Sequence, residues 1–196
     1  MHGLISRSLE NFIRRTYGQE LWSAVMEELD CGFDSFEPMF SYADSLTHQV
    51  IDLSAARLEK PREILLEDFG TFLVTDPSSE RVRRLLRFGG VDYEDFLHSL
   101  DDLPGRARLA VAHLDLPELE LTEFGGGDFA LSIRSDQAGF GHVLLGALRA
   151  LADDYGALAL LEHLGGTQQE ETISIRLLDI EFQKARDFEL AMGAAE

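Results

Sequence analysis

Residues 119–135 read LELTEFGGGDFALSIRS, and this stretch decides the fold class. Apolar and polar residues alternate with period two from Leu119 to Phe124 and again from Phe129 to Ser135, as is typical of strands that bury one face. The GGGD segment between them is made of residues that favour tight turns. The sequence therefore predicts an antiparallel β-hairpin.

The chain around this hairpin predicts helices before it and a mixture of helix and strand after it. Apolar residues recur at helical spacing through most of the first half, and a helix is predicted over about 141–155. Two further strands are predicted over 158–163 and 172–178, with a turn at Gly165-Gly166 between them. A helical N-terminal part followed by an antiparallel sheet with an inserted helix is an α+β architecture.

The length of 196 residues fits a single domain of ordinary size. Hydrophobic residues make up 45% of the chain, which is enough apolar material to bury a core without disulfide or metal staples. We therefore expect one domain over residues 1–180, followed by a polar helical tail over 181–196.

A proline interrupts the last helix predicted before the hairpin. Apolar residues at helical spacing run from Tyr93 to Leu103 and resume at Leu109. Pro104 lacks the N–H that a helix interior needs and its ring clashes with the preceding turn. The helix is therefore predicted to break or kink at Pro104-Gly105.

The charge balance excludes several partners. There are 36 Asp and Glu against 17 Lys and Arg, a formal net charge of −19. Such a surface repels phosphate backbones and anionic lipid heads, so neither nucleic acid nor a membrane is an expected partner. The single cysteine, Cys31, cannot form an internal disulfide, and the sequence has neither an export signal nor a spanning segment. These features predict a cytoplasmic protein.

The sequence carries no catalytic motif that would indicate an enzyme. The Walker loop, HExxH, GxSxG, CxxC and kinase signatures are all missing, and no nucleophile, base and orienting group can be assembled. His98 with Asp101 and Asp102 has helical spacing suited to a metal, but without a further ligand it is better interpreted as a solvated acidic helix end. His163, with Glu162, is interpreted as the end of a strand.

Several short segments, in order along roughly residues 1–180, carry a family resemblance. They are MHGLI at Met1–Ile5 with Tyr17-Gly18 closing the first helix, FLHSLDDLPGRARL at 96–109, LPEL at 116–119 and IRSDQAGF at 133–140. In this order they resemble the haem NO/O2-binding (H-NOX, HNOB) family, the sensor domain of soluble guanylate cyclases and bacterial gas sensors. The resemblance implies an α+β signal-transduction domain that binds haem b and senses nitric oxide or oxygen.

The sequence departs from the family at the residues that hold haem. By this resemblance the histidine that ligates the haem iron falls at Pro104, and proline has no donor atom for iron. The Tyr, Ser and Arg of the Y-x-S-x-R motif, which hold the haem propionates, fall at Ile133, Ser135 and Gln137. Only Ser135 is retained, so the charge-assisted arginine contact is missing. Haem b is therefore doubtful as the cofactor.

His142 is the candidate for a substitute metal ligand. It resembles the pocket-facing distal tyrosine of some oxygen-binding members, although a polar residue on an amphipathic helix is the simpler interpretation. The resemblance places Ile5, Pro117, Ile133 and Ser135 in the same pocket. An apolar or planar ligand is expected to enter between the helical front and the hairpin and to contact these residues.

Three functions follow from these patterns. The favoured one is an H-NOX-like regulatory sensor module that has lost standard histidine-ligated haem and acts through another ligand or a protein. The alternative is a genuine haem-based NO or O2 sensor with a substitute axial ligand such as His142. An enzyme acting on a small molecule in the pocket is the third. The family's partners imply a histidine kinase, a diguanylate cyclase or a chemotaxis component as the output.

Overall fold

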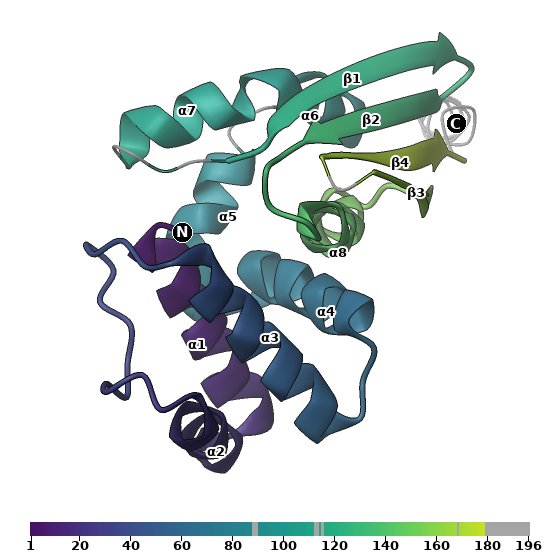
Figure 1. Cartoon of the computed structure of the whole chain (residues 1–196). Helices are drawn as coiled ribbons and strands as arrows, with labels where there is room; N and C mark the ends of the chain where they lie inside the picture. The colour runs from purple at the N-terminus through teal and green to yellow at the C-terminus, as the bar shows by residue number, and fades with distance from the viewer. Residues whose placement is uncertain (88–89, 112–113, 115, 168, 179–196) are drawn as a thin grey trace, which may run out of the picture.

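The computed structural model describes residues 1–87, 90–111, 114, 116–167 and 169–178. It has a group of helices on one side and a four-stranded antiparallel sheet on the other, with one helix between them (Figure 1). The predicted α+β class is therefore confirmed. The predicted tail over 181–196 lies outside the described residues.

The first four helices form one group, which we call the helical front. Gly18 ends the first of them at a backbone φ of 97°, a conformation that glycine adopts readily. Pro61 caps the last one, where its missing N–H costs nothing. The helices are α1 (Gly3–Tyr17), α2 (Gln19–Leu29), α3 (Asp44–Leu58) and α4 (Arg62–Thr75).

The segment before the hairpin breaks earlier than the sequence predicted. Helix α6 (Tyr93–His98) is followed by the 3-10 turn η2 (Leu100–Asp102) and then by α7 (Leu103–Ala110). Pro104 lies in the first turn of α7, where proline is tolerated, so the helix begins there and the break precedes it. Upstream, η1 (Pro77–Ser79) and α5 (Glu80–Arg87) lead out of the helical front.

The sheet has the order β1-β2-β4-β3, with every neighbouring pair antiparallel. The predicted hairpin is confirmed as β1 (Glu118–Gly125) and β2 (Asp128–Arg134), and the second pair is β3 (Ala159–Gly166) and β4 (Glu170–Leu177). The predicted turn at Gly165-Gly166 is wrong, because both glycines pair within β3. The register shifts between His163 and Gly165, and Gly165 has a φ of 85°. We call β1–β4, together with α5–α7 and the helix over Phe140–Tyr155 (α8), the sheet half.

Helix α8 (Phe140–Tyr155) joins the two halves (Figure 1). It packs along α4 at two glycines that let the backbones touch. A Cβ on Gly70 would lie 1.9 Å from the carbonyl oxygen of Val143, and one on Gly146 would lie 1.9 Å from that of Glu67. Each half has its own apolar core, one centred on α1–α4 and the other between the sheet, α8 and α6. The α4–α8 contact is therefore the physical link between two cores.

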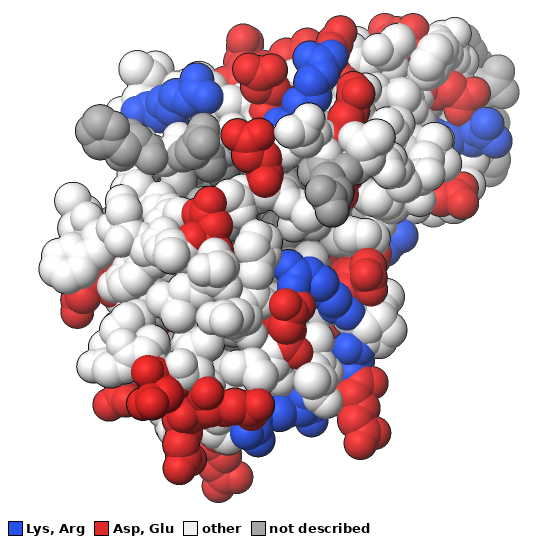
Figure 2. Space-filling model, in the orientation of Figure 1, with Lys and Arg blue, Asp and Glu red and all other residues white. Residues whose placement is uncertain are grey.

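The surface reflects the acidic composition. Figure 2 shows acidic side chains gathered at the end of the helical front where α2 lies, with Lys and Arg scattered between acidic groups elsewhere. Glu20, Glu27, Glu28 and Asp30 are exposed on and beside α2. No helix in the described part of the chain is long and apolar enough to cross a membrane.

Candidate functional site

Pro104 is a buried residue that starts a helix. Its side chain packs inward with Leu103 and Ala107 on α7. The position therefore contributes packing and a helix start, and no atom that can ligate iron.

The first two positions of the divergent motif lie at the end of β2, one inside the strand and one just after it. Ile133 on β2 is 1% exposed and lies in the core with Leu131 and Phe129, which share its face of the strand. Ser135 follows the strand, and its Oγ accepts a hydrogen bond from the backbone N–H of Gln137 at 3.0 Å. Of these two positions, which the resemblance assigns to contacts with haem carboxylates, Ile133 has no donor, whereas the hydroxyl of Ser135 can still donate.

Gln137 ties the β2–α8 loop to the helical front. Its Nε2 donates to Asp44 Oδ2 at 2.5 Å, and its Oε1 lies 2.9 Å from His48 Nε2. Arg62 donates to His48 Nδ1 at 2.8 Å, so His48 is the tautomer that carries its proton on Nε2. We call Asp44, His48, Arg62 and Gln137 the Gln137 strap. Hydrogen bonds from the Met1 ammonium and, less strongly, from Gln137 lower the pKa of the Asp44 carboxyl.

His142, in the first turn of α8, faces two neighbouring elements. Its Nδ1 lies 3.3 Å from Glu67 Oε1 on α4, and Arg149 holds the other oxygen of Glu67 at 2.5 Å. Its ring stacks on that of His163, with centroids 4.2 Å apart and planes 18° apart. His142 therefore belongs to a polar cluster at the point where α4, α8 and the sheet meet.

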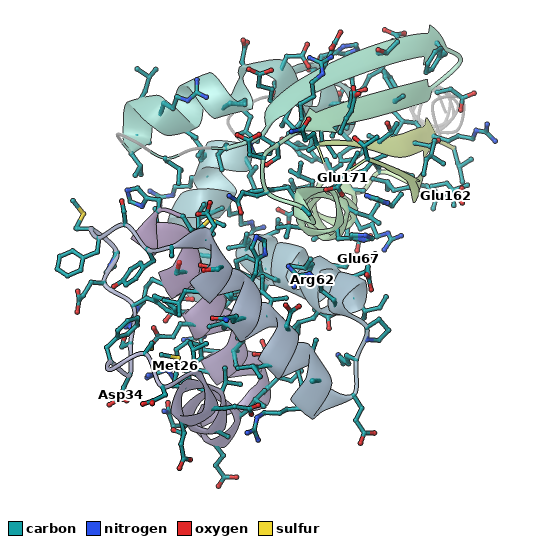
Figure 3. The ribbon with its side chains drawn as sticks, viewed as in Figure 1. Met26, Asp34, Arg62, Glu67, Glu162 and Glu171 are labelled. Atoms are coloured by element: carbon teal, nitrogen blue, oxygen red, sulfur yellow. The ribbon has the colours of Figure 1, made fainter. Side chains whose placement is uncertain are left out.

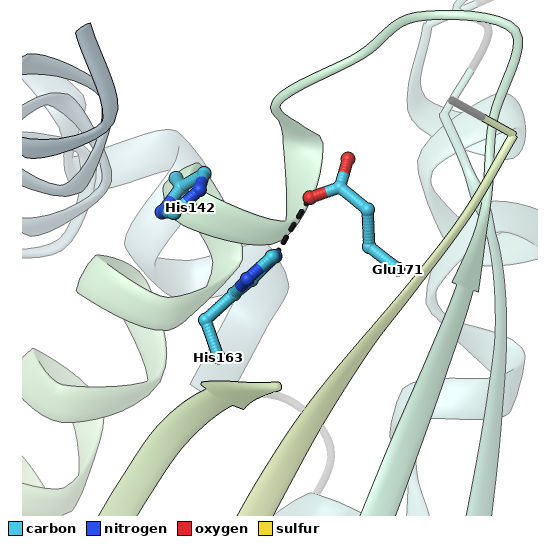
Figure 4. Close-up of side chains that lie close together, drawn as sticks. All are labelled: His142, His163 and Glu171. Atoms are coloured by element: carbon cyan, nitrogen blue, oxygen red, sulfur yellow. Dashed lines mark hydrogen bonds and ion pairs between the residues drawn. The ribbon is translucent and has the colours of Figure 1, made fainter. Parts of the chain in front are cut away.

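His163 on β3 and Glu171 on β4 complete this cluster (Figure 4). His163 Nε2 lies 2.8 Å from Glu171 Oε2, and the other oxygen of Glu171 accepts from the Gly139 N–H at 2.9 Å. The side chains of His163 and Glu171 are only 14% and 12% exposed. Figure 3 shows Glu67 on one side of α8 and Glu171 on the other. We call His142, His163 and Glu171 the two-histidine cluster.

The remaining predicted pocket residues lie on different elements. Ile5 is half-buried on α1, and Pro117 is buried just before β1. Their grouping with Ile133, Ser135 and His142 into one ligand pocket stays a prediction. A separate open pocket of about 290 Å³ lies between α2 and α3. It is lined by Glu28, Leu29, Gln49, Asp52 and Leu53, none of which was predicted to bind a ligand.

The segment with His98, Asp101 and Asp102, which has spacing suited to a metal, makes structural contacts. Asp101 accepts a hydrogen bond from the Leu121 N–H at 2.8 Å, which fixes η2 against β1. His98 is exposed, packs edge-on against Phe129, and lies 3.7 Å from a carboxylate oxygen of Glu123. These contacts agree with the interpretation of His98, Asp101 and Asp102 as a solvated helix end.

The sequence analysis interpreted His142 and His163 separately and did not identify Glu171. The alternation of buried and exposed residues along each strand could have indicated that His163 and Glu171 face the same side of the sheet. His163 has the parity of the buried Leu161, and Glu171 has that of the buried Ile173 and Ile175, so both face α8. The pairing of His163 with Ile173 brings them together, and the alternation within each strand does not reveal this register.

The fold and the sequence together define a sensor-type α+β domain. The sequence model of the haem-NO-binding family matches residues 2–163, and the chain belongs to this family, which supplies haem-based sensor domains to signalling proteins.

Relatives in animals are soluble guanylate cyclases. Soluble guanylate cyclase 89Db of Drosophila melanogaster is 24% identical over 170 residues, covering 87% of this chain and 25% of that protein. Soluble guanylate cyclase gcy-35 of Caenorhabditis elegans is 31% identical over 105 residues, covering 53% of this chain and 15% of that protein. The chain thus spans about a quarter or less of the length of these relatives.

Solved structures share the fold. An H-NOX protein mutant from K. algicida superposes with a TM-score of 0.79 at 15% identity, covering 93% of this chain and 100% of that one. An H-NOX protein from S. oneidensis, in an Fe(II)NO state, superposes with a TM-score of 0.77 at 19% identity, covering 91% and 99%. The predicted fold family is confirmed.

At the positions that the sequence resemblance assigns to the family's haem contacts, three of the residues present do not fit a haem held in the family's manner. Pro104 offers no donor to iron, Ile133 offers none to a carboxylate, and the amide of Gln137 is engaged by Asp44 and His48. No step of a mechanism can therefore be derived through histidine-ligated haem at these positions.

Proposed function

We propose that this chain is a regulatory sensor module of the haem-NO-binding family that works without histidine-ligated haem. The observation that supports the proposal is that Pro104, which the sequence resemblance assigns to the iron ligand position, is a buried, donor-free residue built into the start of α7. Axial ligation fixes haem and sets its chemistry, so losing the ligand removes both the anchor and the usual signal.

The motif positions support the same conclusion. Ile133 is part of the sheet core, and Gln137 uses both ends of its amide to hold α3. Restoring propionate contacts would require both side chains to be replaced, since neither can supply a charged donor. Three of the four positions that hold haem in the family are therefore adapted to other contacts.

Haem ligation through His142 is the second candidate. It is favoured by the tautomer of His142, because an Nδ1–H directed at Glu67 leaves the lone pair on Nε2. It is opposed by the stacking of the His142 ring on His163, which holds the ring within the polar cluster.

Signalling in this proposal comes from the relative position of the two halves. The α4–α8 contact and the Gln137 strap are the links, and a ligand that binds unequally to two packings of these links would shift their populations. We propose an apolar or planar ligand against Ile5, Pro117, Ile133, Ser135 and His142. The output would be a histidine kinase, a diguanylate cyclase, a chemotaxis component or, as in the animal relatives, a guanylate cyclase.

Absorption spectroscopy tests the proposal. The protein is purified from haem-supplemented cells beside a His142→Ala variant, and circular dichroism confirms that both are folded. We expect no intense Soret band in either protein. A Soret band in the parent protein that shifts or disappears in His142→Ala would establish the second candidate and overturn the first.

A ligand experiment tests the proposed pocket. Ile133→Arg places a charge where the sheet is apolar, and Ile133→Val is its conservative control. A neutral planar apolar probe without carboxylates, such as Nile red, should bind the parent and Ile133→Val alike, and Ile133→Arg at least about tenfold more weakly. Equal affinity in all three proteins, each shown to be folded, would refute the pocket.

A further inference from the structure

The two-histidine cluster brings metal-binding side chains from three elements to one point. One nitrogen of His142, one nitrogen of His163 and one oxygen of Glu171 all lie within 4.8 Å of one another. Among the described residues, this is the group of histidine, cysteine and carboxylate side chains that converges in this way. Its members lie on α8, β3 and β4 (Figure 4), whereas Pro104 belongs to α7.

The donor set specifies the class of ion. Two imidazoles and one carboxylate are the protein ligands of many zinc sites with an open fourth position, and also of non-haem iron(II) sites. Hard ions such as Ca²⁺ and Mg²⁺ prefer oxygen ligands and would not select two histidines. The cluster is also largely shielded, since the side chains of His142, His163 and Glu171 are 19%, 14% and 12% exposed.

Outer contacts orient two of the three ligands. The Nδ1 of His142 faces Glu67, so the lone pair of that ring is on Nε2, and a carboxylate behind a histidine is the usual partner of a metal ligand. Arg149 in turn fixes Glu67. The Gly139 N–H holds one oxygen of Glu171 and leaves the other directed at His163.

The third ligand must change its proton. The Gly165 N–H lies 3.1 Å from His163 Nδ1, so the proton of His163 is on Nε2, where it faces Glu171. An ion at Nε2 displaces this proton to Nδ1, with no net release, and breaks the contact with Gly165. One such hydrogen bond contributes far less to stability than a metal site does, so the exchange favours the ion.

Ring orientation must change as well. Two imidazoles stacked with planes 18° apart cannot both direct an in-plane lone pair at one ion between them. One ring must turn about its side-chain bonds. His142 lies in the first turn of α8, next to Gly141. Because Gly141 has no side chain, the helix backbone at this point lies directly against the side chains of His163 and Glu171.

We propose that His142, His163 and Glu171 bind a divalent first-row transition metal such as Zn²⁺, with Glu67 as the positioning residue behind His142. The ion would link α8 to β3 and β4 next to α4, at the joint between the two halves. The site shares His142 with the proposed ligand pocket, but the proposal does not rest on that pocket, because Glu171→Gln should weaken the binding of a metal ion and leave the binding of an apolar ligand unchanged.

Calorimetry with Zn²⁺ tests the site in the full, tag-free chain, and Co²⁺ provides visible d–d bands that report the ligand set. We expect one ion per chain. His142→Ala, His163→Ala and Glu171→Gln should each weaken binding by about tenfold or more, and Glu67→Ala by about 10- to 100-fold. Glu171→Gln keeps the size of the side chain, so it tests ligation even where an alanine variant unfolds.

Two control variants identify adventitious binding. His98→Ala removes an exposed histidine outside the cluster, and Cys31→Ser removes the thiol; neither should change the affinity for Zn²⁺ or the Co²⁺ bands. No Zn²⁺ binding by the folded parent would overturn the proposal. The proposal would also be overturned if Glu171→Gln and both histidine variants left Zn²⁺ binding unchanged. It would be overturned as well if His98→Ala or Cys31→Ser abolished that binding.

Discussion

Both halves of the molecule place a carboxylate among polar partners inside the fold, but they use it differently. In the helical front, the Glu10 side chain is fully buried, and both its oxygens are held by the protein. Its partners are Arg7 and Arg14 at 2.9 and 3.0 Å, the hydroxyl of Ser35 at 3.0 Å, and the Phe36 N–H at 2.8 Å.

The sheet half holds its carboxylate less completely. Glu171 has two partners, His163 and the Gly139 N–H, and the adjacent His142 keeps a lone pair on Nε2. Glu10 is therefore a structural anchor: it fastens the loop after α2 onto α1, and both its oxygens already have partners within the fold. The two-histidine cluster still has a nitrogen lone pair, on His142 Nε2, that can bind a ligand, as a binding site requires.

The largest expected effect is on the free energy of unfolding when each of these two carboxylates is removed. Glu10→Ala removes one partner of a buried ion-pair network, and we expect the free energy of unfolding to fall by about 3 kcal/mol. Glu171→Ala removes a carboxylate that has only two partners, His163 and the Gly139 N–H, and should cost about 1 kcal/mol. Urea unfolding measures both. Equal losses would remove the distinction between anchor and site.

The joint between the halves gives the next effect. A methyl group on Gly146 would lie 1.9 Å from the backbone oxygen of Glu67, so Gly146→Ala must push α4 and α8 apart. We expect a loss of about 2–3 kcal/mol in the same unfolding measurement. Gly105→Ala on α7 is the matched control, because nothing lies within 4 Å of its added methyl group. That control should be neutral or slightly stabilising, and a comparable loss there would show that the joint has no special role.

The Gln137 strap gives the smallest effect. Gln137→Ala removes hydrogen bonds to Asp44 and His48, and we expect a loss of about 1 kcal/mol. The exposed Gln49→Ala on α3 controls for the loss of a glutamine side chain, and it should leave the unfolding midpoint unchanged. An unchanged midpoint for Gln137→Ala as well would mean that α4–α8 packing alone joins the halves.

Periodicity predicted the helices and the hairpin well, because each is encoded by local spacing and end signals. Gly18 and Pro61 mark helix boundaries, and the GGGD segment marks the β1–β2 turn. Pro104 was recognised as a breaker, but its tolerance in a first turn moved the break to residues 99–102.

The candidate site was less predictable, because it depends on register and on packing between distant segments. His142 was identified from the family resemblance, whereas its contacts with Glu67 and His163 arise from helix and strand placement. The glycines at 165 and 166 look like a turn in sequence, and only the pairing with β4 shows that they extend β3. Gln137 was noted as a lost arginine, and its role as a strap to α3 required the tertiary structure.

The most direct test of the central claim is a haem titration of the folded parent protein beside Pro104→His, followed through the Soret band. We predict no saturable Soret change in the parent, because Pro104, which the sequence resemblance places at the iron ligand position, has no donor atom. We predict that any histidine-ligated spectrum is confined to Pro104→His. Saturable one-to-one haem binding by the parent, with the spectrum of a ligated iron, would contradict the proposed function.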